Sequence, residues 1–212
     1  MEAREDFTGI MLGIFLGKVR HMFGTRVVIA DGDPENRQKF KEILTHAGYM
    51  VVGLVEDGRS ALKVIFQNEP DVVIMDARLP GAEGLEIARI IEEHRAAPVI
   101  LLTEAHEQEL VSEAATTWIF GYLIKPVEEK QLFMAIEIAI ASYKKIIKLE
   151  EENKRLRQTL EERKLVERAK GLLMEAKNMS EREAYKYMQR KSMDNCVPIA
   201  RIARRIIISL KK

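Results

Sequence analysis

Cysteine and long apolar runs are scarce in this chain. Cys196 is the only cysteine among 212 residues, which excludes an internal disulfide and is typical of proteins from a reducing compartment. The apolar stretch from Gly9 to Gly17 is too short to span a bilayer, which takes about 20 residues. Its leader, Met1 to Asp6, is acid-rich, and no small-residue cleavage site follows it, unlike in a secretory signal. These absences predict a cytoplasmic protein with no membrane segment.

A large excess of either charge is also lacking, since the net charge of the whole chain is +1. The two signs of charge are unevenly distributed along the chain, however. Residues 161–212 contain 14 Lys and Arg against 7 Asp and Glu, whereas the rest of the chain contains 20 against 26. A basic end on an acidic protein suggests an output surface for a polyanion such as nucleic acid, although a solvated helical face would have the same composition.

Short apolar runs alternate with helical patterns between residues 25 and 127. The runs are Arg26–Ala30, Met50–Leu54, Val72–Met75, Val99–Leu102 and Tyr122–Ile124. Strands that are apolar almost throughout are buried on both faces, as in a parallel sheet with helices on either side. The pattern predicts an α/β fold, a flavodoxin-like doubly wound domain with a five-stranded parallel sheet.

No glycine or proline interrupts the helical pattern between Pro126 and Gly171. Within it, four residues are separated by four, three and four positions, the alternation that is typical of a coiled-coil seam. They are Leu149, Asn153, Leu156 and Leu160. A similar seam in a different phase precedes it: Leu132, Ile136, Ala139, Tyr143 and Ile146. One long helix packed on its own domain would give the same pattern. An Asn in the seam favours a parallel homodimer, in which it fixes the register.

Three helical stretches follow, and they predict a small C-terminal three-helix bundle. Their expected ranges are Glu161–Lys177, Ser180–Lys191 and Val197–Leu210. Ser180 and Glu183 have the spacing of a capping box at the start of the second helix. Pro198 is expected in the first turn of the third helix, where its missing N–H costs nothing.

Polar side chains follow four of the predicted strands. They are Asp31 and Asp33, then Asp76, Thr103 and Lys125. In a doubly wound sheet, ligands bind outside the carboxyl ends of the strands. Carboxylates hold a hard divalent cation, a lysine neutralises phosphoryl charge, and an aspartate can attack as a nucleophile. Each residue alone has a structural explanation, such as a helix cap for Asp33, but together they predict phosphoryl transfer to a carboxylate.

The same region resembles a known family. The segments VVIADGDPENR, PDVVIMDARLPGAEGLEIA, PVILLTE and FGYLIKP are similar to four motifs of bacterial response-regulator receiver domains, and together they cover essentially all of residues 26–145. The resemblance implies that Asp76 is phosphorylated by a sensor histidine kinase or another sensor protein. It also implies that the Thr103 hydroxyl follows the phosphoryl oxygen and that Lys125 pairs with the phosphate, its bond to Pro126 often being cis. Tyr122 would be the aromatic residue that turns inward on activation, or an ordinary packing residue.

The chain departs from the receiver pattern at the metal site. Receivers usually have two adjacent acids after the first strand, and the second of these binds Mg²⁺ directly. Here Asp31 is followed by Gly32, and Asp33 comes one position late and is expected to point elsewhere. The resemblance therefore implies a Mg²⁺ site at Asp31 and Asp76, with Asp33 as a less suitable third ligand, that is weakened by the missing acid.

The end of the chain resembles the ANTAR domain of antitermination regulators. The similarity covers Leu160 to Ile207 and includes RKLVERAKGLLM, SEREAYKYM and IARIARRII. Together with the receiver and the helical connector, it resembles the AmiR/NasT type of response regulator. This implies binding of RNA stem-loops in nascent mRNA leaders, which prevents a terminator from forming.

Ten basic residues of the three helices are candidates for contact with RNA phosphates and loop bases. They are Arg163, Lys164, Arg168, Lys170, Lys186, Arg190, Lys191, Arg201, Arg204 and Arg205. Tyr185 and Tyr187 are possible stacking platforms, although Tyr185 is expected in the core. Two other outputs stay open: a DNA-binding helix-turn-helix that uses residues 197–210 for recognition, and a protein-interaction switch with a degenerate, phosphorylation-independent receiver.

The expected organisation has four parts. They are a dispensable extension over residues 1–22, a receiver over 23–145, a coiled-coil connector over 146–160 and an RNA-binding ANTAR domain over 161–212. No enzymatic output is expected, since the four histidines are scattered and form no arrangement with a nucleophile.

Overall fold

The computed structural model describes residues 24–104 and 119–210. The predicted extension over residues 1–22 lies outside the described residues. The chain divides into two compact units, Met1–Ile146 and Ile147–Lys212, and each is described by itself.

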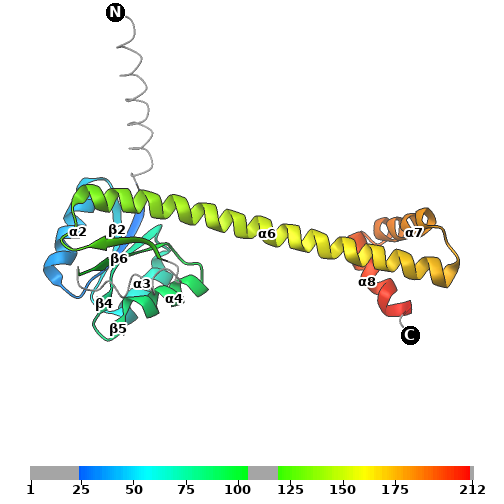
Figure 1. Cartoon of the computed structure of the whole chain (residues 1–212), viewed down its shortest axis with the longest axis horizontal. Coiled ribbons are helices and arrows are strands. Elements are labelled where there is room, and N and C mark those ends of the chain that lie inside the picture. Colours follow the sequence, from blue (N-terminus) through cyan, green and yellow to red (C-terminus); the bar gives the residue numbers. More distant parts are fainter. Residues whose placement is uncertain (1–23, 105–118, 211–212) are drawn as a thin grey trace, which may run out of the picture. The chain divides into compact units, whose positions relative to one another are not determined.

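The first unit contains a five-stranded sheet in which every neighbouring pair of strands is parallel (Figure 1). Its strands are β1 (Arg26–Ala30), β2 (Met50–Val55), β3 (Val72–Asp76), β6 (Val99–Thr103) and β7 (Ile119–Ile124). They lie in the order β2-β1-β3-β6-β7, which is that of a flavodoxin-like doubly wound fold. The predicted fold class and the predicted strands are confirmed. β7 begins three residues earlier than expected, because Gly121 interrupts its apolar pattern where the strand approaches Ile100 closely.

Helices cover both faces of this sheet. They are α2 (Pro34–His46), α3 (Gly58–Asn68), α4 (Gly84–Glu93) and the first turns of α6 (Glu129–Lys177). One core cluster lies between the sheet and α3 and α4, and a second lies between the sheet and α2 and α6. A short antiparallel hairpin, β4 (Arg78–Leu79) and β5 (Ala82–Glu83), follows β3 and was not expected from the sequence.

The first of the two predicted seams is part of the receiver core. Leu132, Ile136 and Ala139 are completely buried in the second cluster, and the Tyr143 hydroxyl donates to the Arg95 carbonyl oxygen over 2.7 Å. This part of α6 therefore packs on its own domain, which explains the change of phase at Ile146. Among the residues that the structure describes, none covers the second seam in this way, and its leucines are more than half exposed.

The second unit contains the rest of α6, α7 (Glu181–Asp194) and α8 (Ile199–Leu210) around a third core. The predicted capping box is present, since Ser180 and Glu183 each bond to the other's backbone N–H. α7 runs three residues further than expected. α8 begins after Pro198, whose carbonyl oxygen accepts from the Arg201 N–H over 2.9 Å, so that Pro198 lies at the entry to the helix.

Candidate functional site

Four neighbouring strands bring the predicted phosphoryl-transfer residues to one edge of the sheet. Asp31 follows β1, Asp76 ends β3, Thr103 ends β6 and Lys125 follows β7. Because these strands are adjacent and parallel, their carboxyl ends meet. The sheet register pairs Asp76 with Leu102, next to Thr103.

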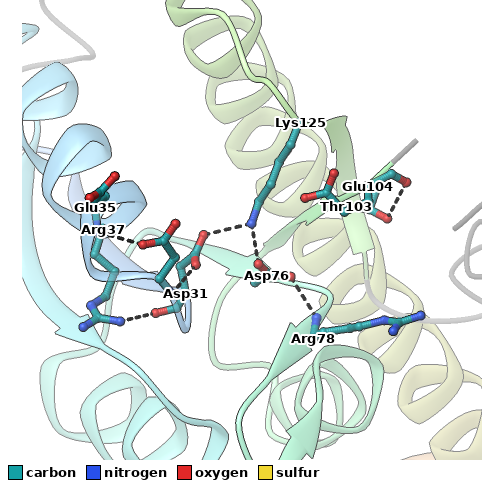
Figure 2. Close-up of polar contacts among 9 residues, drawn as sticks. Asp31, Glu35, Arg37, Asp76, Arg78, Thr103, Glu104 and Lys125 are labelled. Carbon is teal, nitrogen blue, oxygen red and sulfur yellow. Dashed lines mark hydrogen bonds and ion pairs between the residues drawn. The ribbon is translucent and has the colours of Figure 1, made fainter. Parts of the chain in front are cut away.

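A lysine bridges the two acids at the centre of this edge. The Lys125 Nζ donates to Asp31 Oδ2 over 3.1 Å and to Asp76 Oδ2 through a shorter bond (Figure 2). The Asp31 side chain is 1% exposed, whereas that of Asp76 is 17% exposed. Burial works to lower the pKa of Lys125, but the hydrogen bonds to Asp76 and Asp31 outweigh it and hold this pKa above its ordinary value. The ammonium therefore stays charged beside Asp76, the more accessible carboxylate.

Backbone groups fix both carboxylates. The Asp33 N–H donates to Asp31 Oδ1 over 2.8 Å, and the Arg78 N–H donates to Asp76 Oδ1 over 2.9 Å. Arg37 donates to the Asp31 carbonyl oxygen (Figure 2). The contributions of Arg37 and Arg78 were not expected from the sequence. Arg78 lies in the unpredicted hairpin, and Arg37 is one of several exposed-looking charges in a helical pattern.

Asp33, the third member of the predicted Mg²⁺ set, has a structural role at the start of α2. Its carboxylate accepts from the Glu35 N–H over 2.9 Å and caps α2, so it is used by the helix that begins at Pro34. Over residues 24–104 and 119–210, no group of three or more His, Cys, Asp or Glu side chains is arranged to hold a metal.

Two carboxylates still suit a weak Mg²⁺ site. Mg²⁺ commonly keeps several waters and binds through one or two carboxylates together with a substrate phosphate. Asp31 and Asp76 supply that donor set next to each other, whereas the space beside Gly32 is filled by Pro80. A Cβ atom at Gly32 would lie 3.0 Å from the Pro80 Cδ.

Thr103 and Tyr122 lie on the neighbouring strands. Thr103 is 2% exposed, and its hydroxyl donates to the Glu104 carbonyl oxygen over 3.4 Å. The Tyr122 ring packs against the first core cluster, and its hydroxyl is buried without a hydrogen-bond partner among the described residues. The peptide bond between Lys125 and Pro126 is cis, as the family resemblance implied.

In the second unit, nine of the ten predicted RNA-contacting residues are exposed, and Lys170 is the exception. Lys170 is 8% exposed and pairs with Glu167 over 2.8 Å and with Glu181 over 2.7 Å. Hydrogen bonds to Glu167 and Glu181 raise its pKa. Lys170 therefore links α6 to the start of α7, and its contact with RNA stays a prediction.

The two tyrosines of α7 differ from expectation. Tyr185 was expected in the core but is 44% exposed, because it lies one residue after the buried Ala184. Tyr187 is half-buried against the third core, and the Lys177 ammonium lies 4.6 Å from the centre of its ring. Lys177 was not among the predicted RNA-contacting residues. Its position at the end of the predicted helix Glu161–Lys177 was the signal in the sequence that could have indicated it.

Comparison with known proteins identifies both units. The family model of the response regulator receiver domain matches residues 27–137, and that of the ANTAR domain matches residues 154–207. The transcriptional regulatory protein PdtaR of Mycobacterium tuberculosis is 38% identical over 185 residues, covering 87% of this chain and 90% of PdtaR. The chain belongs to the response regulators with an ANTAR domain. It is thus a two-component response regulator with an RNA-binding output.

Solved structures agree with the receiver assignment of this response regulator. A receiver domain protein from Clostridium thermocellum is 28% identical with a TM-score of 0.53, over 57% of this chain and 98% of that one. The receiver domain of a modulated diguanylate cyclase from Desulfovibrio desulfuricans is 30% identical with the same TM-score, over 56% and 95% of the two chains. The matched domains are regulatory, not catalytic. Among the described residues, no helix of the response regulator has the length and apolar character to cross a membrane.

Proposed function

We propose that Asp76 accepts a phosphoryl group from a sensor histidine kinase or another sensor, and that this controls the ANTAR domain. The observation that carries the proposal is the bridge from Lys125 to Asp76 and Asp31. An Asp76 oxygen attacks phosphorus, the bond from phosphorus to the donor breaks, and an aspartyl phosphate forms. Lys125 neutralises part of the phosphoryl charge, and Thr103 supplies a hydroxyl at the end of the next strand. Mg²⁺, held by Asp31 and Asp76, would neutralise further charge.

We place the receiver at residues 23–145, the connector at 146–160 and the ANTAR domain at 161–212. The family match to the ANTAR domain begins at residue 154, inside this connector. The end of the connector therefore continues into the first ANTAR helix, so that a change in the connector reaches the output directly.

Mg²⁺ affinity tests whether Gly32, which stands where receivers usually have a second acid, weakens the metal site. Gly32→Asp alone is expected to tighten Mg²⁺ binding only modestly, because its Cβ would press on the Pro80 ring. Gly32→Asp with Pro80→Ala removes that contact and adds a third carboxylate, for which we expect about tenfold tighter Mg²⁺ binding. Isothermal titration with Mg²⁺ measures the effect, and Pro80→Ala alone is the control. Tight binding by the unchanged chain would contradict the proposed weak site.

We further propose that the connector forms a parallel homodimer with a second copy of this chain. Leu149, Leu156 and Leu160 are 53%, 62% and 53% exposed and lie on one face of α6 with Asn153. Such a face is stabilised by burial against an identical helix, and an Asn in the seam selects a parallel register.

Charges beside the seam fit the same arrangement. In a parallel two-stranded coiled coil, the residues that flank the seam form pairs between the helices. With Asn153 in the seam, Lys145 would face Glu150 of the second copy, and Glu152 would face Arg157. Both pairs have opposite signs, so the sequence around the seam favours a parallel dimer in register.

For the output we propose binding of stem-loops in nascent mRNA leaders, which prevents a terminator hairpin and allows transcription to continue. The support is the ANTAR match together with the nine exposed basic residues. Competition between RNA hairpins and duplex DNA for the full chain, at several salt concentrations, tests the proposal. Preference for duplex DNA would favour a DNA-binding output instead, and indifference to both nucleic acids would favour a protein-interaction switch.

A further inference from the structure

Two clefts on the ANTAR unit differ in the charge of their walls. The first has a volume of about 410 Å³, and its lining includes Tyr185, Arg163 and the acids Glu162 and Glu167. The second has a volume of about 490 Å³ and lies where α6 ends and α7 begins. Its lining includes Lys177, Glu183, Lys186, Tyr187 and Arg190. Each cleft thus offers one tyrosine, but in opposite electrostatic surroundings.

The second cleft is the one that suits a polyanion. Three cations line it, and its one acid, Glu183, is occupied by the capping box. Glu183 accepts from the Ser180 N–H over 2.8 Å and from the Ser180 hydroxyl over 2.6 Å, and these bonds lower its pKa. The first cleft is lined by one guanidinium and two carboxylates, one of which, Glu167, pairs with Lys170, so its walls offer an RNA phosphate no excess of positive charge.

Tyr187 is held as a platform in the second cleft. Its ring packs against the third core, and the Lys177 ammonium lies over the ring at 4.6 Å from the centroid. A cation over a partly exposed aromatic ring is held weakly, whereas stacking of a nucleic-acid base on such a ring is a stronger interaction. An unpaired base can therefore replace the ammonium on the ring.

The backbone brings cations of α6 and α7 into the same cleft as this platform. Asn178 adopts φ +52° directly after α6, which turns the chain toward the capping residue of α7. Lys186 and Arg190 stand one helical turn apart on α7 and are both exposed. Two cations at that spacing can contact the phosphates on either side of a stacked nucleotide.

We propose that this cleft binds an unpaired nucleotide of an RNA loop, with its base stacked on Tyr187 and its phosphates on Lys186 and Arg190. The displaced Lys177 ammonium then lies close enough to contribute to phosphate binding. The inference rests on the proposed RNA-binding output and adds which surface recognises the loop. Bases inside a duplex are covered on both faces by their neighbours and do not reach the ring, so this cleft favours a hairpin loop over a duplex with the same number of phosphates.

Two labelled RNAs test this site with the full chain: a hairpin with an all-adenosine loop that carries a fluorescent adenine analogue, and a blunt RNA duplex with the same number of phosphates. Tyr187→Leu is expected to weaken hairpin binding about tenfold and to abolish the fluorescence change that reports stacking. Tyr187→Phe keeps the ring and should bind within about twofold of the unchanged chain. Tyr185→Leu in the first cleft is the matched control and should have no effect.

The basic residues have a separate readout. Lys186→Gln with Arg190→Gln should lower the salt dependence of hairpin binding by about one to two phosphate contacts. These side chains are exposed, so the double variant should melt like the unchanged chain. The cleft assignment is overturned if Tyr185→Leu weakens hairpin binding and Tyr187→Leu does not, or if Tyr187→Leu weakens both RNAs equally. A chain that binds neither RNA at low salt contradicts the RNA-binding output itself.

Discussion

Asp76→Asn is expected to abolish phosphorylation of the chain by a small phosphodonor in the presence of Mg²⁺. The amide lacks the anionic oxygen that attacks phosphorus. It retains a carbonyl oxygen that can accept from the Arg78 N–H, a bond of 2.9 Å in the structure, so the loop after β3 should keep its conformation. Intact-protein mass spectrometry measures the phosphorylated fraction directly.

Asp33→Asn is the matched control for this loss. Asp33 follows the same edge of the sheet, but its side chain caps α2, and Asn is an equally good cap. Phosphorylation should therefore persist in Asp33→Asn. Continued phosphorylation of Asp76→Asn, or equal loss in both variants, would show that Asp76 is not the acceptor.

Leu156→Asp with Leu160→Asp is expected to dissociate the homodimer and to weaken binding to paired RNA hairpins by at least about tenfold. The two substitutions put like charges opposite each other in the proposed seam. Because a dimer holds two ANTAR units together, its loss removes the gain from linked binding, whereas affinity for a single hairpin should change little. Light scattering gives the mass in solution, and titration with paired and single hairpins gives the affinities.

Two sets of variants make this test specific to the seam. Arg155→Asp with Gln158→Asp adds acids outside the seam on the same exposed helix and should leave the dimer intact. Glu152→Arg should weaken the dimer by placing like charges opposite Arg157, and adding Arg157→Glu should restore it. A dimer that survives the leucine changes, or an equal loss for paired and single hairpins, would contradict avidity through this connector.

The sheet, and the residues that meet at its carboxyl edge, could be predicted from the sequence. Each strand is a compact apolar run, and parallel topology alone requires Asp31, Asp76 and Lys125 to meet. Asp33 shows the limit of that argument. This residue, two positions after Asp31 in the same loop, caps the next helix, and its role could not be predicted without the direction of its side chain.

Contacts between different helices and strands could not be predicted from the sequence pattern. Lys170 looks like its basic neighbours in the sequence, yet it pairs with Glu167 one turn away and with Glu181 on α7. Tyr185 and Tyr187 are both aromatic residues in one helix, and the packing of α7 decides which one meets the core. The contact of Pro80 with the Gly32 position arises from a hairpin of two-residue strands, too short to give an alternation in the sequence.

The central proposal is that phosphorylation at Asp76 raises RNA affinity by changing self-association through the connector. The most direct measurement is the mass in solution and the affinity for paired hairpins of one sample before and after phosphorylation, with Asp76→Asn treated in the same way. We expect the phosphorylated chain to shift toward the dimer and to bind paired hairpins about 5–150-fold more tightly, the range of a typical coupling between sites. Asp76→Asn should show neither change. Phosphorylated and unphosphorylated chains with equal mass and equal RNA affinity would contradict the proposal.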